Sequence, residues 1–448
     1  MSCCFSEVSR GLARSVCLGV CLLVVPAATA SGQFLTEDEA VRIAVENNPQ
    51  VMAADARVSY AGAGVWQSTS NMLPTVSASC AKIRNREEVA FEFDMPEIPG
   101  LDIPDMGKQI IMPLEMKTFS VDVTQPLFTG GALYQARKIA SRSLDAARSD
   151  LMAVRQSVAL EARKAYYNLI KSQGLLRIAQ ETEAQVTESK RVVDKMFEVG
   201  LVPRSDVLRV DASLAGVRQS MQQAEEGVEL ARAQLNIILN RPMDAAVSVE
   251  PTVEIVPFDR PLKECTETAL ANRPDLHQMS ANVDIARRGV KAQMGSLLPS
   301  VALVYHYEWS DLATAFAPQD SWRLMGVLSY DLPLGFGNVA RVRGARAQAR
   351  EVERGLEMLT DGIGLEVKAA WSSLSVARKG LEFAETQLAS ATENRRVMDR
   401  RYREGDATYL DLLDGDTLLI QAKVNNLSTR IDYRIAVASL RKAMGEEE

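Results

Sequence analysis

The sequence predicts a mainly α-helical protein with a small β part, built from long antiparallel coiled-coil hairpins and four β-strands. Two turns, from Phe197 to Asp206 and from Tyr402 to Asp411, lie 205 positions apart, and in each a glycine follows the aromatic residue by three positions. Each turn separates about 60 residues of helical pattern from about 35 more. The 448 residues include 17 Pro and 6% aromatics, a balance typical of long helices more than of a thick core.

Residues 1–30 have the features of a signal peptide. Arg10 and Arg14 precede an apolar run from Val16 to Val25, and the small residues Ala28-Thr29-Ala30 follow it. We therefore exclude residues 1–30 from the fold and expect the remaining chain to be exported.

Charge and cysteine content argue against several classes of protein. The formal net charge is −7, and the basic residues are spread along helix faces without clustered aromatics, so we expect no nucleic-acid partner. Cys80 and Cys265, the two cysteines after the signal peptide, are too few for a disulfide framework. No later run reaches about 18 apolar residues, so we expect no membrane-spanning helix.

The remaining chain has the pattern of a duplication, with structural repeats at 31–240 and 241–448. The matching segments, 225 positions apart, are Ala44 to Pro49 with Ala269 to Pro274, and Met72 to Pro74 with Leu297 to Pro299. The turn glycines, Gly200 and Gly405, recur after 205 positions because the first repeat has a longer loop. Self-similarity at this range predicts two copies of one structural unit.

Each repeat is expected to begin with two helices. The first is short, at Thr36 to Asn47 and at Leu262 to Ala271. A proline then starts a second helix of about 24 residues. That helix ends at Leu73 and Leu298, because a residue that precedes proline is pushed out of the helical region.

The next segments change from a helical to an alternating pattern, and we expect four strands of about ten residues. In the second repeat the apolar set is Val301, Leu303, Tyr305, Tyr307 and Trp309. Asn85 to Glu115 contains four prolines, so we expect a long exposed loop between the first two strands.

The residues alone leave two interpretations of these strands open. About ten residues suffice for a tilted strand that crosses a bilayer, and the same alternation fits a small sheet in water. Four strands are too few to close into a barrel, so a membrane sheet would need two or three copies of the chain. The rest of the chain offers no globular core to cover a sheet, which favours the membrane interpretation.

The long helices are expected at Ala132 to Met196 and at Val339 to Arg401, each about 95 Å long at a rise of about 1.5 Å per residue. Their apolar residues follow steps of three and four, which define a coiled-coil seam. A helix of this length with one narrow seam needs neighbours in a larger assembly.

No active site, metal site or cofactor site emerges from the sequence, so we expect a protein that is not an enzyme. Gly335 to Ala340 fits a dinucleotide-binding pattern, but the helix after it is too long for a crossover, and the glycines suit a strand-to-helix turn better. The two histidines, His277 and His306, have no partner at metal-ligand spacing.

The two turns carry acidic residues with two interpretations. Ser205 beside Asp206, and Thr408 with Asp411, suit helix capping. Capping does not explain Asp414, which lies three positions after Asp411 on the same helix face. If copies assemble around an axis, Asp411 and Asp414 become stacked acidic rings that attract cations.

These features together resemble the TolC-type outer membrane efflux proteins. The resemblance spans nearly the whole chain after residue 30 and rests on the two Ala-x-x-Asn-x-Pro openings, Thr124-Gln125-Pro126, Leu332-Pro333 and the two turns. It implies a homotrimer in the cell outer membrane and in contact with its lipid. Each chain would give four strands to a 12-stranded β-barrel and its hairpins to an α-barrel that crosses the periplasm.

The resemblance also implies roles for the turn residues. Asp411 and Asp414 correspond to acidic rings at the pore entrance, and Asp206 and Tyr402, with Ser205, to contacts that close it. Ala407 departs from the pattern, because the best-known members have an arginine of this contact there. The candidates to replace that arginine are Arg204, Arg401 and Arg403.

The implied function is a passive exit duct of a tripartite efflux or type I secretion system. Its expected partners are a periplasmic adaptor and an inner-membrane pump of the RND, ABC or MFS type. The alternative is a periplasmic adaptor or structural coiled-coil protein without a pore. An adaptor has one hairpin inserted into small β-domains, whereas two hairpins are expected here. The substrate, the particular pump and the resting state of the channel stay open.

Overall fold

The computed structural model describes residues 34–92, 108–313, 318–331 and 335–446. The chain divides into two units, Met1–Phe34 and Leu35–Glu448. The described helices and strands all belong to the unit that begins at Leu35. The expected signal peptide and the Leu332-Pro333 motif lie outside the described residues.

The described elements occur in one order twice, apart from a small extra hairpin. The first series is α1 (Glu37–Asn47), α2 (Pro49–Ser70), β1 (Thr75–Arg84), β4 (Glu115–Phe128), α3 (Ala132–Glu198) and α4 (Arg204–Ile238). The second is α5 (Leu262–Asn272), α6 (Pro274–Gly295), β5 (Ser300–Ser310), β6 (Asp320–Ser329), α7 (Gly337–Glu404) and α8 (Tyr409–Ala443). The prediction of long helical hairpins with four strands is confirmed.

Local chemistry explains where the short helices start. Thr36 caps α1, and Asn48 caps α2 by accepting a hydrogen bond of 2.8 Å from the Gln50 backbone, with Pro49 as the first helical residue. In the second repeat Arg273 takes the place of Asn48 without a side-chain cap. Its guanidinium instead binds Asp275 and Glu366, each at 2.6 Å.

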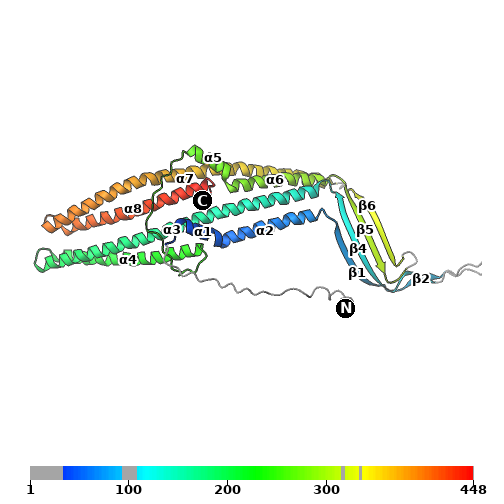
Figure 1. The fold of residues 1–448 in the computed structure, drawn as a ribbon, viewed down its shortest axis with the longest axis horizontal. Coiled ribbons are helices and arrows are strands. Elements are labelled where there is room, and N and C mark those ends of the chain that lie inside the picture. Colours follow the sequence, from blue (N-terminus) through cyan, green and yellow to red (C-terminus); the bar gives the residue numbers. More distant parts are fainter. Residues whose placement is uncertain (1–33, 93–107, 314–317, 332–334, 447–448) are drawn as a thin grey trace, which may run out of the picture. The chain divides into compact units, whose positions relative to one another are not determined.

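Four strands form one antiparallel sheet in the order β1-β4-β5-β6, so the pairing of β4 with β5 joins the two repeats (Figure 1). The register places the alternating residues on opposite faces. One face carries aromatic and aliphatic side chains, and Tyr305 stacks on Trp322 with ring centroids 6.3 Å apart. The other face carries polar groups, including His306, whose Nδ1 lies 2.7 Å from the Asp122 carboxylate.

The expectation of a plain loop from Asn85 to Glu115 was wrong. β2 (Val89–Glu92) and β3 (Lys108–Met112) pair there as a second, two-stranded antiparallel sheet. The loop was predicted because the segment contains four prolines. Short apolar runs such as Val89-Ala90-Phe91 flank these prolines, and their residue types favour strands. Residues 93–107 lie outside the described part of the chain.

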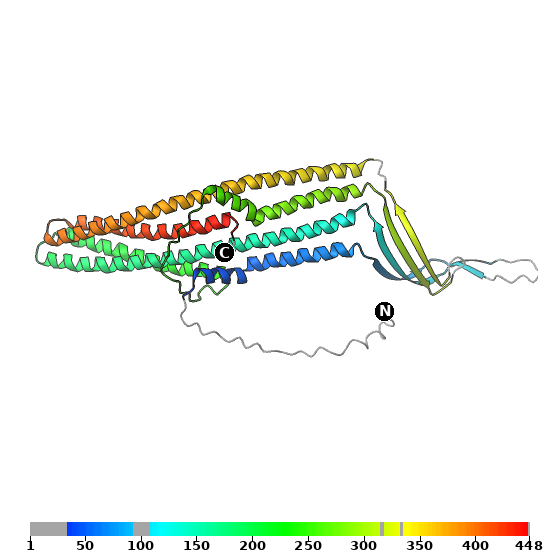
Figure 2. The same cartoon turned by 45° about the horizontal axis from the view of Figure 1, so that its top comes forward.

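Four helices continue the sheet and lie side by side in the same order as its strands. The contacts of α2 with α3, α3 with α6, and α6 with α7 give the order α2-α3-α6-α7, which matches the order of the strands to which they connect (Figure 2). Away from the sheet, α3 pairs with α4 and α7 with α8, and α3 also contacts α8. None of the helices in the described ranges is both long and apolar enough to cross a membrane.

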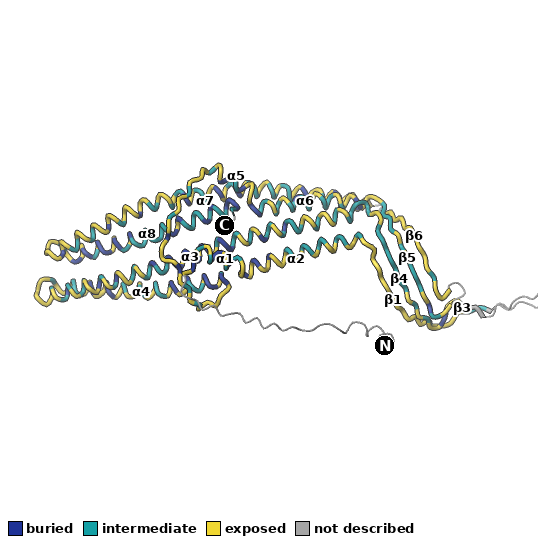
Figure 3. The backbone as a smooth tube through the Cα atoms, viewed as in Figure 1, coloured by how far each residue is buried: buried dark blue, intermediate teal, exposed yellow. Residues whose placement is uncertain are grey.

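Buried residues gather around the middle of the long helices, whereas the strands are largely half-buried or exposed (Figure 3). One cluster packs α1 against α3 and the end of α4, and includes Ala44, Val158 and Leu235. A second packs α5 against α7 and α8, and includes Ala269 and Ile363. Two smaller clusters lie further along the hairpins, around Tyr402 and around Ala422.

Candidate functional site

The candidate site consists of the two hairpin turns, which lie at the end of the long helices away from the sheet (Figure 1). Gly200, with φ of 76°, and Gly405, with φ of 85°, adopt the left-handed conformation that ends α3 and α7. In each turn the next amide bonds back to the helix: Leu201 donates to the Met196 carbonyl, and Asp406 to the Arg401 carbonyl, both at 2.8 Å. A side chain at either glycine would be strained by the backbone alone.

The second turn contains the expected capping box. The Thr408 hydroxyl accepts from the Asp411 amide at 3.3 Å, and the Asp411 carboxylate accepts from the Thr408 amide at 2.8 Å. Hydrogen bonds from the Thr408 hydroxyl and amide lower the pKa of Asp411 below its usual range. Asp414, one turn further along α8, is exposed, as is Asp411.

At the first turn, the expectation that Ser205 caps its helix was wrong. Pro203 holds the extended backbone at the cap position, and α4 begins at Arg204, so Ser205 is already inside the first turn. Its hydroxyl lies 3.5 Å from the carboxylate of Asp206. Asp206 is half-buried in the first turn, where a negative charge suits the positive end of the helix.

The two turns pack on one another through a shared apolar cluster. Val193 and Val210 of the first hairpin contact Tyr402, Tyr409 and Leu412 of the second. The two tyrosine rings meet edge to face, with centroids 6.0 Å apart. A single chain therefore holds its two hairpin tips together.

Tyr402 and Asp206, the expected closing residues, lie near each other. Tyr402 is 6% exposed, and its hydroxyl oxygen is buried without a hydrogen-bond partner in the described part of the chain. Burial, and then the charge of Asp206, raise the pKa of Tyr402. No hydrogen bond joins the two side chains among the described contacts.

The arginines considered as replacements at Ala407 are engaged elsewhere or exposed. Arg403 forms an ion pair of 3.1 Å with Asp399. Arg401 donates to the carbonyl of Asp406 at 3.5 Å, and Arg204 is exposed. Within the described contacts, none of the three bonds to Asp206.

Sequence reasoning missed a charged cluster behind the second turn. Asp416 of α8 is buried and accepts a hydrogen bond of 2.9 Å from Arg395 of α7, while Gln185 of α3 donates a second one. A sequence signal existed, because a basic and an acidic residue recur at the same spacing in both hairpins. Lys190 and Asp211 lie 205 positions before Arg395 and Asp416.

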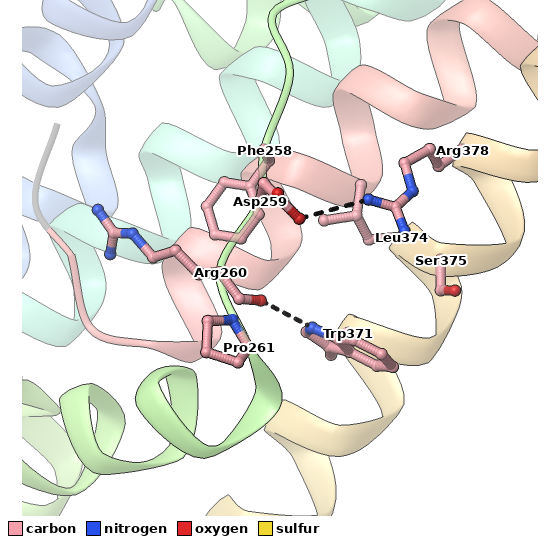
Figure 4. A pocket seen from close by; sticks show the side chains of 8 residues that line it. All are labelled: Phe258, Asp259, Arg260, Pro261, Trp371, Leu374, Ser375 and Arg378. Atoms are coloured by element: carbon pink, nitrogen blue, oxygen red, sulfur yellow. Dashed lines mark hydrogen bonds and ion pairs between the residues drawn. The ribbon is translucent and has the colours of Figure 1, made fainter.

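One pocket of the described residues lies where a connecting segment meets α7. In Figure 4 the segment Phe258 to Pro261 crosses α7, and the Trp371 indole donates to the Arg260 carbonyl at 3.1 Å. Asp259 and Arg378 pair across the same pocket at 3.6 Å. These contacts fasten a connecting segment to α7. Within the described ranges no group of three His, Cys, Asp or Glu side chains could hold a metal ion.

Comparison with known proteins gives one consistent match. The family model described as "Outer membrane efflux protein" matches residues 40–241 and 266–446. Protein CyaE of Bordetella pertussis is 24% identical over 91% of this chain and 83% of its own length. Outer membrane efflux protein BepC of Brucella suis is 22% identical over 91% of this chain and 90% of its own.

The fold matches that of a solved outer membrane channel. The Campylobacter jejuni CmeC structure superposes with a TM-score of 0.78 at 18% identity, over 91% of this chain and 85% of that one. Neither the family match nor these relatives support the alternative of a periplasmic adaptor. The family model covers most of both hairpin-containing halves. The chain therefore belongs to the outer membrane efflux protein family: it is a passive efflux channel of the outer membrane that extends into the periplasm, and not an enzyme.

Proposed function

We propose that three copies of this chain form the exit duct of a tripartite efflux or type I secretion system. A periplasmic adaptor and an inner-membrane pump of the RND, ABC or MFS type would deliver the substrate and supply the energy, since the family is one of passive channels. The observation that carries the proposal is the family match over both halves of the chain.

The unpaired edges of the sheet support assembly of several copies. β1 and β6 are the edge strands, and four strands are too few to close a barrel. Unpaired backbone groups are costly in lipid, so the edges need partner strands. α2 lies at the matching edge of the helical layer and exposes Tyr60 and Trp66, at 83% and 71%. A second copy would cover these aromatics.

For the turns, we propose that Asp411 and Asp414 form acidic rings at the entrance and that Asp206, Tyr402 and Ser205 help to hold it closed. The position of both acids near the start of α8, with neither fully buried, supports the rings. The burial of Tyr402 near Asp206, in the cluster that joins the two tips, supports the closing role. Gly200 and Gly405 would set the bends.

The division of the chain stays part of the proposal: a signal peptide at 1–30 and two structural repeats at 31–240 and 241–448. The repeated order of helices and strands supports the two repeats.

Cross-linking of detergent-extracted protein tests the assembly. We expect a trimer that resists dissociation and inserts into lipid vesicles. A chain that stays monomeric in detergent and in lipid would contradict the proposal. Co-purification of an adaptor after cross-linking in cells, with loss of substrate export when the gene is deleted, tests the partners.

A further inference from the structure

The two hairpins of one chain meet mainly along a seam between α3 and α8. Near the middle of the long helices, Gly174 lies against Leu427, so closely that a Cβ at Gly174 would be 2.5 Å from a Leu427 methyl carbon. Closer to the turns, Lys423 forms an ion pair of 2.8 Å with Glu181. The apolar cluster around Val193 completes the seam at the tips.

Between this ion pair and the tips, the seam contains a buried polar cluster that joins three helices. The Asp416 side chain of α8 is 7% exposed. It accepts from Arg395 of α7 at 2.9 Å and from the Gln185 amide of α3. Arg395 also pairs with Asp399 at 3.6 Å. The contact of Asp416 with Gln185 is the one that crosses from the second hairpin to the first.

The equivalent positions of the first hairpin show what is special about this cluster. Lys190 stands 205 positions before Arg395, and it pairs with Asp194 at 3.3 Å and Asp211 at 2.6 Å. These side chains are 31% to 47% exposed, and their described contacts stay within their own hairpin. Ser390 occupies the position that corresponds to Gln185. The duplication therefore supplies the charged set twice, and one copy is buried and linked across the seam.

We propose that Gln185, Asp416 and Arg395 form a latch that holds the second hairpin against the first, and that the latch must break for the entrance to open. This inference rests on the proposed opening at the turns, but it concerns a contact behind them. Asp416 acts here as a positioning residue, because it fixes the start of α8, which carries Asp411 and Asp414.

The physical basis is the burial of the cluster. Hydrogen bonds to buried charged groups stabilise more than those on the surface, and removing one partner leaves the other unsatisfied. The nearby pair of Lys423 and Glu181 is 33% and 52% exposed, so screening weakens it. Of these two polar links near the turns, the Gln185 contact is thus the stronger.

The test compares Gln185→Ala with Asp211→Asn. The first change removes the contact across the seam and leaves the pair of Arg395 and Asp416 intact. The second is the matched control, since Asp211 is the first-hairpin equivalent of Asp416. In planar bilayers we expect Gln185→Ala to raise the ratio of open to closed channels about tenfold or more, while Asp211→Asn stays near wild type.

Hydrogen exchange separates the latch from the channel function. In Gln185→Ala trimers, amides at the start of α8 should exchange about tenfold faster than in wild type or Asp211→Asn. Unchanged exchange and unchanged opening in Gln185→Ala would overturn the latch. Faster exchange in a protein that never conducts would support the latch and contradict the channel proposal instead.

Discussion

Gln185 of α3 donates a hydrogen bond to the carboxylate of Asp416 of α8. The two residues are 231 positions apart in the chain, and their bond joins the first hairpin to the second. Asp416 lies five positions after Asp411 on one helix, so the bond lies about 7 to 8 Å along the helix axis from the capping box. The acidic residues of the second turn are therefore attached, through a short rigid stretch of helix, to a buried link with the first hairpin.

Asp414→Ala tests the acidic rings more cleanly than Asp411→Ala. Asp411 also belongs to a capping box, whose loss costs about 0.5–2 kcal/mol of helix stability. Asp414 lies outside that box. We expect Asp414→Ala to reduce cation selectivity and block by multivalent cations, measured as reversal potentials and conductance in bilayers. Thr408→Ala, which weakens the cap and keeps both acids, should retain selectivity. Unchanged selectivity in Asp414→Ala would refute the ring.

Tyr402→Phe tests whether the Tyr402 hydroxyl takes part in closing the entrance. Within one chain the hydroxyl is buried and has no partner among the described residues, so its loss should not destabilise an isolated chain. If the hydroxyl, which lies near Asp206, helps to close the entrance, the change should favour the open state and let large antibiotics enter cells. Tyr409→Phe, the ring beside it in the same cluster, is the matched control. Equal antibiotic sensitivity in wild type and Tyr402→Phe would argue against the contact.

Acidification is expected to favour the latched state. Burial raises the pKa of Asp416 above its ordinary value of 3.8, although Arg395 and Gln185 oppose the rise and Asp399 adds to it. Tyr409 of α8 is the other titratable group that interacts with it. An opened state hydrates Asp416 and returns its pKa toward 3.8, so the latched state binds the proton more tightly.

The expected pH window lies between that raised pKa and 3.8. As the pH falls through it, wild-type opening in bilayers should become rarer, and Asp416→Asn should lack this part of the response. Asp211→Asn should keep the wild-type response. If Asp416→Asn follows the wild-type curve, the latch does not depend on this proton.

A pair of glycine substitutions tests the close approach along the seam. Gly216 of α4 has open space around it, so Gly216→Ala should stabilise by about 0.8–1 kcal/mol through helix propensity. Gly174→Ala gains the same propensity, but its methyl group would press on Leu427, and overpacking costs about 1–3 kcal/mol. Thermal unfolding followed by circular dichroism should show a higher midpoint for Gly216→Ala than for Gly174→Ala. The reverse order of the two midpoints would contradict the close approach of Gly174 to Leu427.

Much of the fold could be predicted because strong local signals agree with it. Prolines at 49 and 274, glycines at 200 and 405 and the steps of three and four along α3 and α7 each fix a local conformation, and the duplication repeats them. The β2–β3 hairpin was missed because its strands are short and stand beside prolines. Ser205 was misassigned as a cap because Pro203 occupies the cap position and the helix begins at Arg204, before the serine.

The latch could not be predicted because burial depends on which helices meet. Asp211 and Asp416 look equivalent in sequence, and the difference arises from the packing of α8, and not of α4, against the Gln185 side of the seam. A sequence pattern shows that two charged sets are repeated, but the desolvation of one of them is a property of the tertiary contact.

Single-channel recording from purified trimers in planar bilayers tests the central claim most directly. The account predicts that wild-type protein opens rarely, and that the double variant Gln185→Ala with Tyr402→Phe opens often, conducts passively and prefers cations through Asp414. Trimers of the double variant that insert into the bilayer and never conduct would contradict the claim that this chain forms a passive exit channel.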